Sequence, residues 1–182
     1  METPEAATLL RPVIPPPGGI WADLGAGSGT FTRALATLLG EGAVIYAGDR
    51  LPQAAPTTPP SATIQTLVAD FRDPLPLPDL DGIVMGNSLH FIPYAEQSTV
   101  LKRIISYLKP DGVLVLVEYD QHRRSRWVPY PVPLDRFESL ANEVGLTTVR
   151  EIGRRRSRFG PTEMYAGVAT KREGRNLNDA RE

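Results

Sequence analysis

The sequence predicts an α/β protein built on a doubly wound, mostly parallel β-sheet with helices on both faces. Short apolar, strand-like segments alternate along the chain with segments that carry one apolar face at helical spacing, and this alternation is typical of β-α-β units. Most of the 18 prolines among the 182 residues fall in four clusters, at residues 12–17, 52–60, 74–78 and 129–133. Because proline disrupts helices and central strands, these clusters mark loops, and the elements lie between them.

The first half of the chain is expected to contain four strands and one helix. The expected strands are the short apolar segments at residues 19–24, 43–48, 63–68 and 81–86. Thr30 is the expected N-cap of the helix after the first strand. The apolar face of this helix consists of Phe31, Ala34, Leu35 and Leu38. The crossover at residues 50–62 holds four prolines and no apolar stripe, so we expect an irregular loop there, or one helical turn at most.

The next helix and strand form the centre of the second half. A helical stripe runs from about Tyr94 to Leu108. It is followed by Lys109–Gly112, a sequence that ends a helix and then turns. Residues 113–119 have no alternation of polar and apolar side chains, which predicts a central strand covered on both faces.

A further helix and two strands complete the expected fold. The helix is expected to start at Asp135 as its N-cap, with Glu138 in a capping box, and to end at Gly145. Residues 147–152 and 164–170 are the last expected strands, and their hairpin-like spacing favours an antiparallel pair.

Composition and charge exclude several classes of function. The absence of cysteine excludes disulfides, thiolate metal sites and a cysteine nucleophile. Two histidines and no cluster of ligands argue against a metal site. A formal net charge of −1 argues against indiscriminate binding to nucleic acid, although residues 150–182 carry nine basic and five acidic side chains. The longest aliphatic run, residues 113–117, is too short to span a membrane, and no secretory signal is recognised, so a cytoplasmic location is expected.

A glycine-rich loop joins the first expected strand to the first expected helix. Residues 23–30 have glycine at the alternate positions 25, 27 and 29, which allows a ligand to approach the backbone closely. The free N–H groups at the start of the helix favour a negative group such as a carboxylate. The dinucleotide fingerprint has its third glycine one residue later, so this tighter loop favours a ligand with a carboxylate and a cationic amine. Asp23 is expected to face that amine, directly or through water.

Polar side chains also follow the next strands, at the edge where open α/β sheets bind ligands. Asp49 comes twenty residues after Gly29, and an acid at this place can accept both hydroxyls of a ribose. Arg50 follows it. Asp70 is expected to accept a hydrogen bond from an adenine amine, and Phe71 to pack against the adenine ring.

Taken in order, these segments resemble the motifs of the class I S-adenosylmethionine-dependent methyltransferases. The segments that carry the resemblance are residues 23–29, 48–49, 69–71, 87–91 and 108–118. The resemblance implies a seven-stranded sheet with the last strand inserted antiparallel, and S-adenosylmethionine lying across the strand ends. The glycine loop and Asn87 would then lie at the methionine part, Asp49 at the ribose and Asp70 at the adenine. The complete expected cofactor-binding set is Asp23, Gly25, Ala26, Gly27, Ser28, Gly29, Asp49, Arg50, Asp70, Phe71, Asn87 and Ser88.

The resemblance extends over residues 18–170, which are expected to form a single domain. Residues 1–17 are expected to be a short N-terminal extension, and residues 171–182 a polar, disordered tail. Many relatives cover the substrate with a longer extension. The short one here favours either an open site or a homodimer in which a second subunit completes the site.

The expected function is transfer of a methyl group to a small-molecule acceptor by in-line displacement. The protein mainly aligns donor and acceptor, and a base is needed only when the acceptor must lose a proton. His90, after the fourth strand, is the first candidate base, because histidine changes charge near neutral pH. Tyr119 is the second. A packing role remains the alternative for both His90 and Tyr119. Residues 120–133 either cover the substrate site or form a plain surface loop.

Two other functions remain as alternatives. A non-catalytic S-adenosylmethionine-binding module would explain the short extension and the unusual crossover. An RNA methyltransferase would use the basic run Arg154–Arg158 to contact phosphate. The fourth strand lacks the Asn/Asp-Pro-Pro-Tyr/Phe motif of base-amine methyltransferases, which argues against nucleic acid. A nicotinamide-dependent dehydrogenase is disfavoured by the glycine spacing.

Overall fold

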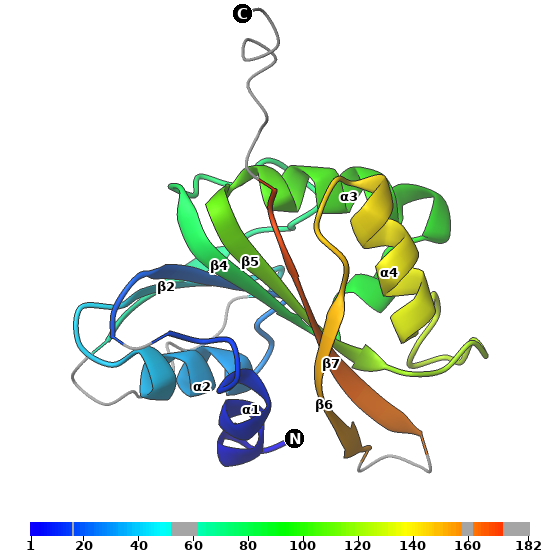
Figure 1. Ribbon diagram of the computed structural model, residues 1–182, viewed down its shortest axis with the longest axis horizontal. Helices are drawn as coiled ribbons and strands as arrows, with labels where there is room; N and C mark the ends of the chain where they lie inside the picture. Colours follow the sequence, from blue (N-terminus) through cyan, green and yellow to red (C-terminus); the bar gives the residue numbers. More distant parts are fainter. Residues whose placement is uncertain (16, 52–61, 158–161, 173–182) are drawn as a thin grey trace, which may run out of the picture.

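A computed structural model of the chain describes residues 1–15, 17–51, 62–157 and 162–172, and its centre is a seven-stranded sheet (Figure 1). The strands are β1 (Ile20–Leu24), β2 (Val44–Asp49), β3 (Thr63–Val68), β4 (Leu80–Gly86), β5 (Leu108–Tyr119), β6 (Arg150–Arg156) and β7 (Glu163–Thr170). The helices are α1 (Thr3–Leu10), α2 (Thr30–Leu39), α3 (Tyr94–Ser106) and α4 (Leu134–Glu143), with a 3₁₀ turn η1 (Leu89–Phe91).

The strand order is β3-β2-β1-β4-β5-β7-β6, and the first five strands are parallel. β7 is antiparallel to both of its neighbours, β5 and β6. The predicted doubly wound sheet and its inserted antiparallel strand are therefore confirmed. The order reverses at β1, which lies between β2 and β4. Such a switch point opens a crevice at the carboxyl ends of the strands.

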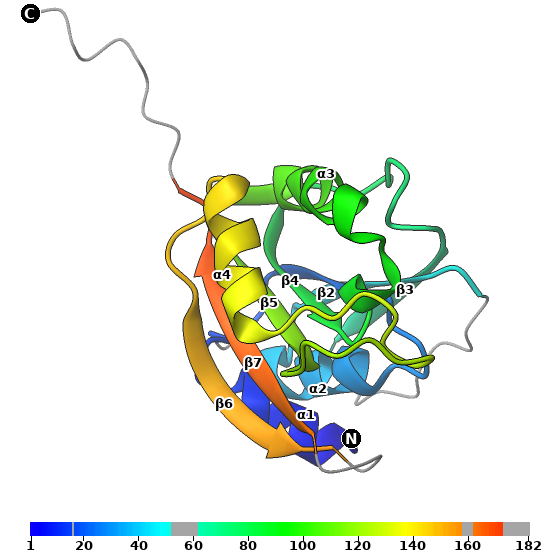
Figure 2. The same ribbon diagram turned by 90° about the vertical axis from the view of Figure 1, so that its right-hand side faces the viewer.

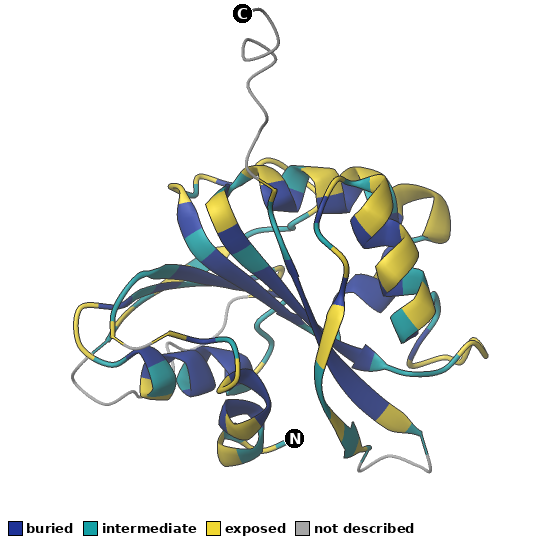
Figure 3. Ribbon diagram, in the orientation of Figure 1, coloured by how far each residue is buried: buried dark blue, intermediate teal, exposed yellow. Residues whose placement is uncertain are grey.

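Helices cover both faces of the sheet, with α1 and α2 on one side and α3 and α4 on the other (Figure 1). Each helix turns buried residues toward the sheet and exposed residues outward (Figure 3). Trp21 and Phe31 lie flat on the strands because their neighbours are glycines: a Cβ added at Gly82 would overlap the Trp21 ring, and one at Gly86 the Phe31 ring. Close packing of these two rings against β4 therefore stabilises the part of the sheet next to the glycine loop.

The N-terminal segment contains a helix that was not predicted. Helix α1 packs against α2 and buries Leu9 and Leu10 in the core that α2 also contributes to. Glu2 and Glu5 form a capping box at its start, and Arg155 of β6 forms an ion pair with Glu5. Glu2 is not one of the usual N-cap residues, and the available signal was the proline in the first turn, Pro4.

Two predicted N-caps are wrong, by one residue for α2 and by two residues for α4. Gly29 precedes α2 with a left-handed φ of 78°, and Thr30 is the first helical residue with no capping hydrogen bond. Helix α4 begins at Leu134, whose N–H donates to Asp120 Oδ1 at 3.2 Å. Asp135 therefore lies inside the first turn of α4, where its Oδ1 accepts the N–H of Arg136 at 2.8 Å.

Two further boundaries differ from the prediction. Strand β5 begins at Leu108, before the expected turn, and residues 109–112 form an irregular part of the strand. Asp111 takes a φ of 61° there. Strand β6 begins at Arg150 and not at residue 147. Gly145 follows α4 with a φ of 85°, as expected for a helix end.

Two expectations fall wholly or partly on residues that the structure does not describe. The irregular crossover at 50–62 falls on residues 52–61, which lie outside the described residues. The disordered tail falls on residues 173–182, which lie outside them as well. Lys171 pairs with Leu146 in an isolated bridge. Within the described residues, no helix has both the length and the apolar character needed to cross a membrane.

Candidate functional site

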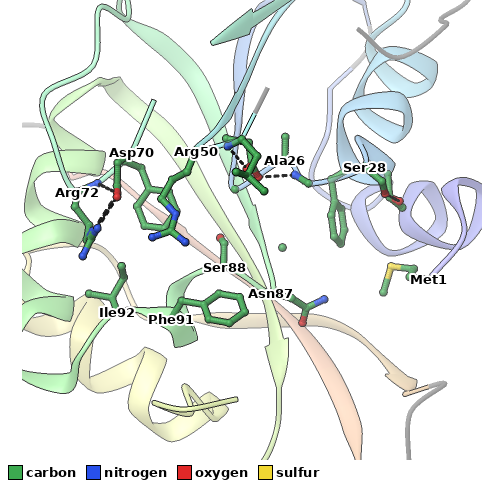
Figure 4. A pocket seen from close by; sticks show the side chains of 18 residues that line it. Met1, Ala26, Ser28, Arg50, Asp70, Arg72, Asn87, Ser88, Phe91 and Ile92 are labelled. Carbon is green, nitrogen blue, oxygen red and sulfur yellow. Dashed lines mark hydrogen bonds and ion pairs between the residues drawn. The ribbon is translucent and has the colours of Figure 1, made fainter. Parts of the chain in front are cut away.

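Two cavities lie next to each other at the carboxyl ends of the central strands. The first has a volume of about 490 Å³, which is within the usual range for sites that bind small molecules. Its wall consists of the glycine loop, the ends of β2 and β3, and the segment after β4 (Figure 4). The predicted cofactor residues in this wall are Gly25, Ala26, Gly27, Ser28, Asp49, Arg50, Asp70, Phe71, Asn87 and Ser88. Asp23 and Gly29 do not line it.

The glycine loop is held against β2 and β4 by contacts that exclude side chains. The N–H groups of Gly25 and Ala26 both donate to the carbonyl oxygen of Gly48, at 2.8 and 3.0 Å. Gly25 has a φ of 81°, and a Cβ there would overlap the Cβ of Ser88. A residue other than glycine would therefore push the loop away from the cavity and strain the backbone.

Asp49 points its carboxylate across the end of β2. Its Oδ2 accepts the N–H of Gly27 at 2.8 Å, and its Oδ1 accepts the N–H of Leu51 at 3.0 Å. These two bonds fix the orientation of the carboxylate. Each oxygen keeps a second lone pair, so Asp49 is able to accept hydroxyl groups from a ligand in the cavity.

Asp70 is paired with an arginine that the sequence analysis did not single out. Arg72 donates to both carboxylate oxygens of Asp70, at 2.7 to 3.1 Å, as the dashed lines in Figure 4 show. The hydrogen bond from Arg72 holds the pKa of Asp70 below its usual value, which keeps the carboxylate charged at the cavity wall. The pair is two residues apart on a loop, so charge spacing alone could have indicated it.

Two buried oxygens lack a hydrogen-bond donor within the described part of the chain: Asp23 Oδ1 and Asn87 Oδ1. Asp23 is fully buried, and its Oδ2 accepts the Thr32 hydroxyl at 2.6 Å. Burial raises the pKa of Asp23 to about 6, although the Thr32 hydrogen bond lowers it. Asp23 does not line the cavity, so contact with a ligand amine would require a bridging water. Unpaired acceptors of this kind fit a ligand that brings N–H donors.

The second cavity has a volume of about 610 Å³ and contains both predicted base candidates, His90 and Tyr119. Asn87 and Phe91 line both cavities, so the two spaces meet at these residues. The described residues that line the second cavity are Asn87, His90, Phe91, Tyr119, Gln121, Ser125, Trp127, Val128, Ser157 and Thr162. A ligand in the second cavity would therefore adjoin one in the first.

His90 is held by a glutamate that the sequence analysis did not nominate. His90 Nδ1 lies 2.6 Å from Glu118 Oε2, and the His90 backbone N–H donates to Glu118 Oε1 at 3.2 Å. The side chains are 2% and 0% exposed. Glu118 follows the apolar run of β5, and an acid at the end of a buried central strand was the available signal.

The loop at residues 120–133, which leads from β5 to α4 (Figure 2), contributes Gln121, Ser125, Trp127 and Val128 to the lining of the second cavity. The Tyr130 N–H donates to the His90 carbonyl oxygen at 3.0 Å, which ties the loop to η1. Trp127 lines the cavity although its side chain is 77% exposed. His122 does not line it and lies on the exposed side of the loop.

Two of the three described arginines of the basic run are engaged in ion pairs. Arg154 contacts Asp120 at 2.5 Å and Glu151 at 2.8 Å, and Arg155 contacts Glu5. Arg158, the last member of the run, lies outside the described residues. No group of three or more His, Cys, Asp or Glu side chains within the described ranges is arranged to hold a metal ion.

A search of known proteins finds a relative with similar sequence. Trans-aconitate 2-methyltransferase of Mycolicibacterium gilvum is 33% identical over 111 residues, which are 61% of this chain and 36% of that protein. The chain thus spans about a third of the length of this relative.

Solved structures share the fold at low sequence identity. The 1,6-didemethyltoxoflavin-N1-methyltransferase of Burkholderia thailandensis, solved with its substrate and S-adenosylhomocysteine, is 16% identical with a TM-score of 0.72, over 94% of this chain and 78% of that one. The magnesium protoporphyrin IX methyltransferase of Synechocystis, solved with S-adenosylmethionine, is 16% identical with a TM-score of 0.65. The match covers 93% of this chain and 77% of that one.

The match to a protein family is more specific than the shared fold. Residues 22–116, more than half of the chain, match the family model described as a methyltransferase domain. This region contains the glycine loop, Asp49, Asp70 and Asn87. The chain belongs to the family of class I, Rossmann-like S-adenosylmethionine-dependent methyltransferases.

Proposed function

We propose that this chain binds S-adenosylmethionine in the first cavity and transfers its methyl group to a small molecule in the second. The observation that carries the proposal is the junction of the two cavities at Asn87 and Phe91. A methyl donor and an acceptor must be in line for the displacement, and adjoining cavities allow the protein to align them.

The first cavity has the groups that the cofactor requires. The oriented carboxylate of Asp49 would accept the ribose hydroxyls, and Asp70 with Phe71 would hold the adenine. The N–H groups at the start of α2 would favour the carboxylate, and the unpaired oxygens of Asn87 and Asp23 would accept from the amine. The cofactor supplies a methyl group already activated on a sulfonium, so the residues of the chain mainly bind, align and exclude water.

In the second cavity, His90 would take a proton from the acceptor, with Tyr119 as the other candidate. Tyr119 follows β5, and its ring centroid lies 6.1 Å from that of His90. The bond to Glu118 favours His90, because a carboxylate at Nδ1 fixes the ring and stabilises the charge that proton transfer creates.

A small-molecule acceptor is supported by the relatives named above, whose names specify small molecules. It is also supported by the ion pairs of Arg154 and Arg155, which leave these side chains less able to contact phosphate. The RNA alternative predicts salt-sensitive RNA binding, and a homodimer predicts a doubled mass in light scattering.

The test of cofactor binding is calorimetric titration with S-adenosylhomocysteine. We expect Asp49→Ala to weaken binding by about 2 kcal/mol or more, because the ribose hydroxyls lose a charged acceptor. Asp79→Ala is the matched control, because Asp79 is exposed and does not line the cavity. Equal affinity of the two variants would contradict the assignment of Asp49. Binding without methyl transfer to any acceptor would support a non-catalytic module.

A further inference from the structure

We propose that the second cavity takes an uncharged aromatic acceptor with an ionisable hydroxyl group, and that Glu118 is a positioning residue that acts through His90. The proposal rests on the function proposed above and adds the chemical class of the acceptor. It is carried by the lining of the cavity and by the buried contact between Glu118 and His90.

The described lining of the second cavity is aromatic and neutral. Phe91, Tyr119 and Trp127 contribute rings, and the other side chains are amides, hydroxyls or aliphatic groups apart from His90. Planar molecules pack well against such rings. Phe91 is 58% and Trp127 is 77% exposed, so apolar ring surface remains available to a ligand.

The same lining argues against a polycarboxylate such as trans-aconitate. Carboxylates are usually bound by arginine or lysine, often through two parallel hydrogen bonds. No lysine or arginine is among the described residues that line the cavity. The nearby Arg124 and Arg126 lie over the rings of Tyr130 and Trp127, at 4.8 and 5.7 Å from the ring centroids.

Glu118 determines which nitrogen of His90 is left for the acceptor. An ionised carboxylate only accepts hydrogen bonds, so the 2.6 Å contact requires the proton on Nδ1. Nε2 then carries the free lone pair, and none of the described residues forms a hydrogen bond with it. Tyr119 is the other titratable side chain close to His90.

The acceptor O–H gives its proton to Nε2, and the oxygen forms a bond to the methyl carbon as the carbon–sulfur bond of the methyl sulfonium breaks. The sulfur keeps the electron pair and becomes a neutral thioether. His90 becomes an imidazolium, which Glu118 stabilises until the proton passes to water.

The first experiment uses 4-nitrophenol as a probe, because its phenolate absorbs visible light and the phenol does not. Each variant is first saturated with S-adenosylhomocysteine, with binding checked by calorimetry, and is then titrated at a pH at which the free probe is protonated. We expect the wild-type protein to bind the probe and to raise its phenolate fraction. Trans-aconitate should not displace it.

Substitutions separate the roles of the residues. His90→Gln should abolish the rise in phenolate, and Glu118→Gln should reduce it, because a neutral amide does not stabilise the imidazolium. With S-adenosylmethionine, His90→Gln should slow methylation of the probe by about 10²- to 10⁴-fold. His122→Gln is the matched control, because His122 is the only other histidine of the chain and does not line the cavity.

Trp127→Ala gives a test that does not depend on a buried substitution. Trp127 is exposed, so its removal should leave the fold intact and weaken probe binding by about tenfold or more. If S-adenosylhomocysteine binds but 4-nitrophenol does not, or trans-aconitate displaces the probe, the inference is overturned and the proposed function stands. If S-adenosylhomocysteine does not bind, both are overturned.

Discussion

At the scale of single residues, Asp23 makes stability depend on pH in an unusual direction. Its pKa is raised from 3.8 to about 6 by burial, whereas an aspartate in the unfolded chain titrates near 3.9. Between these values the folded state holds more protons than the unfolded state, so stability decreases as pH rises through this window. A shift of this size corresponds to about 3 kcal/mol at neutral pH.

We therefore expect Asp23→Asn to be more stable than the wild-type protein at neutral pH, because the amide carries no charge and can still accept from Thr32. The advantage should shrink as the pH is lowered toward 3.8, where the wild-type carboxyl is protonated as well. Urea unfolding of both proteins across this range measures the difference. Asp79→Asn, at an exposed position, should show no such trend, and a constant difference for Asp23→Asn would refute the burial argument.

The residues of the candidate site differ in how far sequence could predict them. Asp49 and Asn87 could be predicted to line a cavity because strand ends and glycine spacing are local features. Glu118 could not be assigned a role in this way, since its partner His90 is 28 residues away and comes close only when β4 and β5 pair. Asp23 was predicted to face the ligand amine directly or through water; it is fully buried and accepts the Thr32 hydroxyl, so the contact through water stays a prediction.

At the scale of elements, the start of helix α4 depends on Asp120. Its Oδ1 accepts the N–H of Leu134, and its Oδ2 contacts Arg154 of β6. We expect Asp120→Ala to lower the free energy of unfolding by about 1–2 kcal/mol, as does loss of a helix cap. Asp135→Ala is the control, and urea unfolding should show the smaller loss for it. A larger loss of unfolding free energy for Asp135→Ala than for Asp120→Ala would show that Asp135 caps the helix.

The elements themselves could be predicted mainly where periodicity is strong. The stripes of α3 and α4 and the apolar run of β5 specify their type, but not the residues at which they begin. Those boundaries depend on partners from elsewhere in the chain, as Asp120 shows for α4. Helix α1 escaped prediction because its apolar face is short, and its stability comes from packing against α2.

At the scale of the whole molecule, the alternation of strands and helices predicts a parallel sheet but not the order of its strands. The insertion of β7 between β5 and β6 joins residues far apart in sequence, such as Val113 and Thr170. No local pattern encodes that pairing, and only the resemblance to a known family implied it. The order matters for function because the reversal at β1 puts the cavities at one edge of the sheet.

Because both cavities lie at the carboxyl ends of the strands, a bound ligand should slow hydrogen exchange at that edge of the sheet. S-adenosylhomocysteine should slow exchange of amides at residues 25–29 and 87–91, because a ligand stabilises the closed form of the segments it contacts. A third cavity, of about 250 Å³, lies at the opposite edge beside Trp21 and residues 109–113. Residues 109–112 do not line the first cavity, so the ligand should leave exchange of their amides unchanged. Equal protection at both edges, or protection at residues 109–112 alone, would mean that the carboxyl ends of the strands are not the binding side.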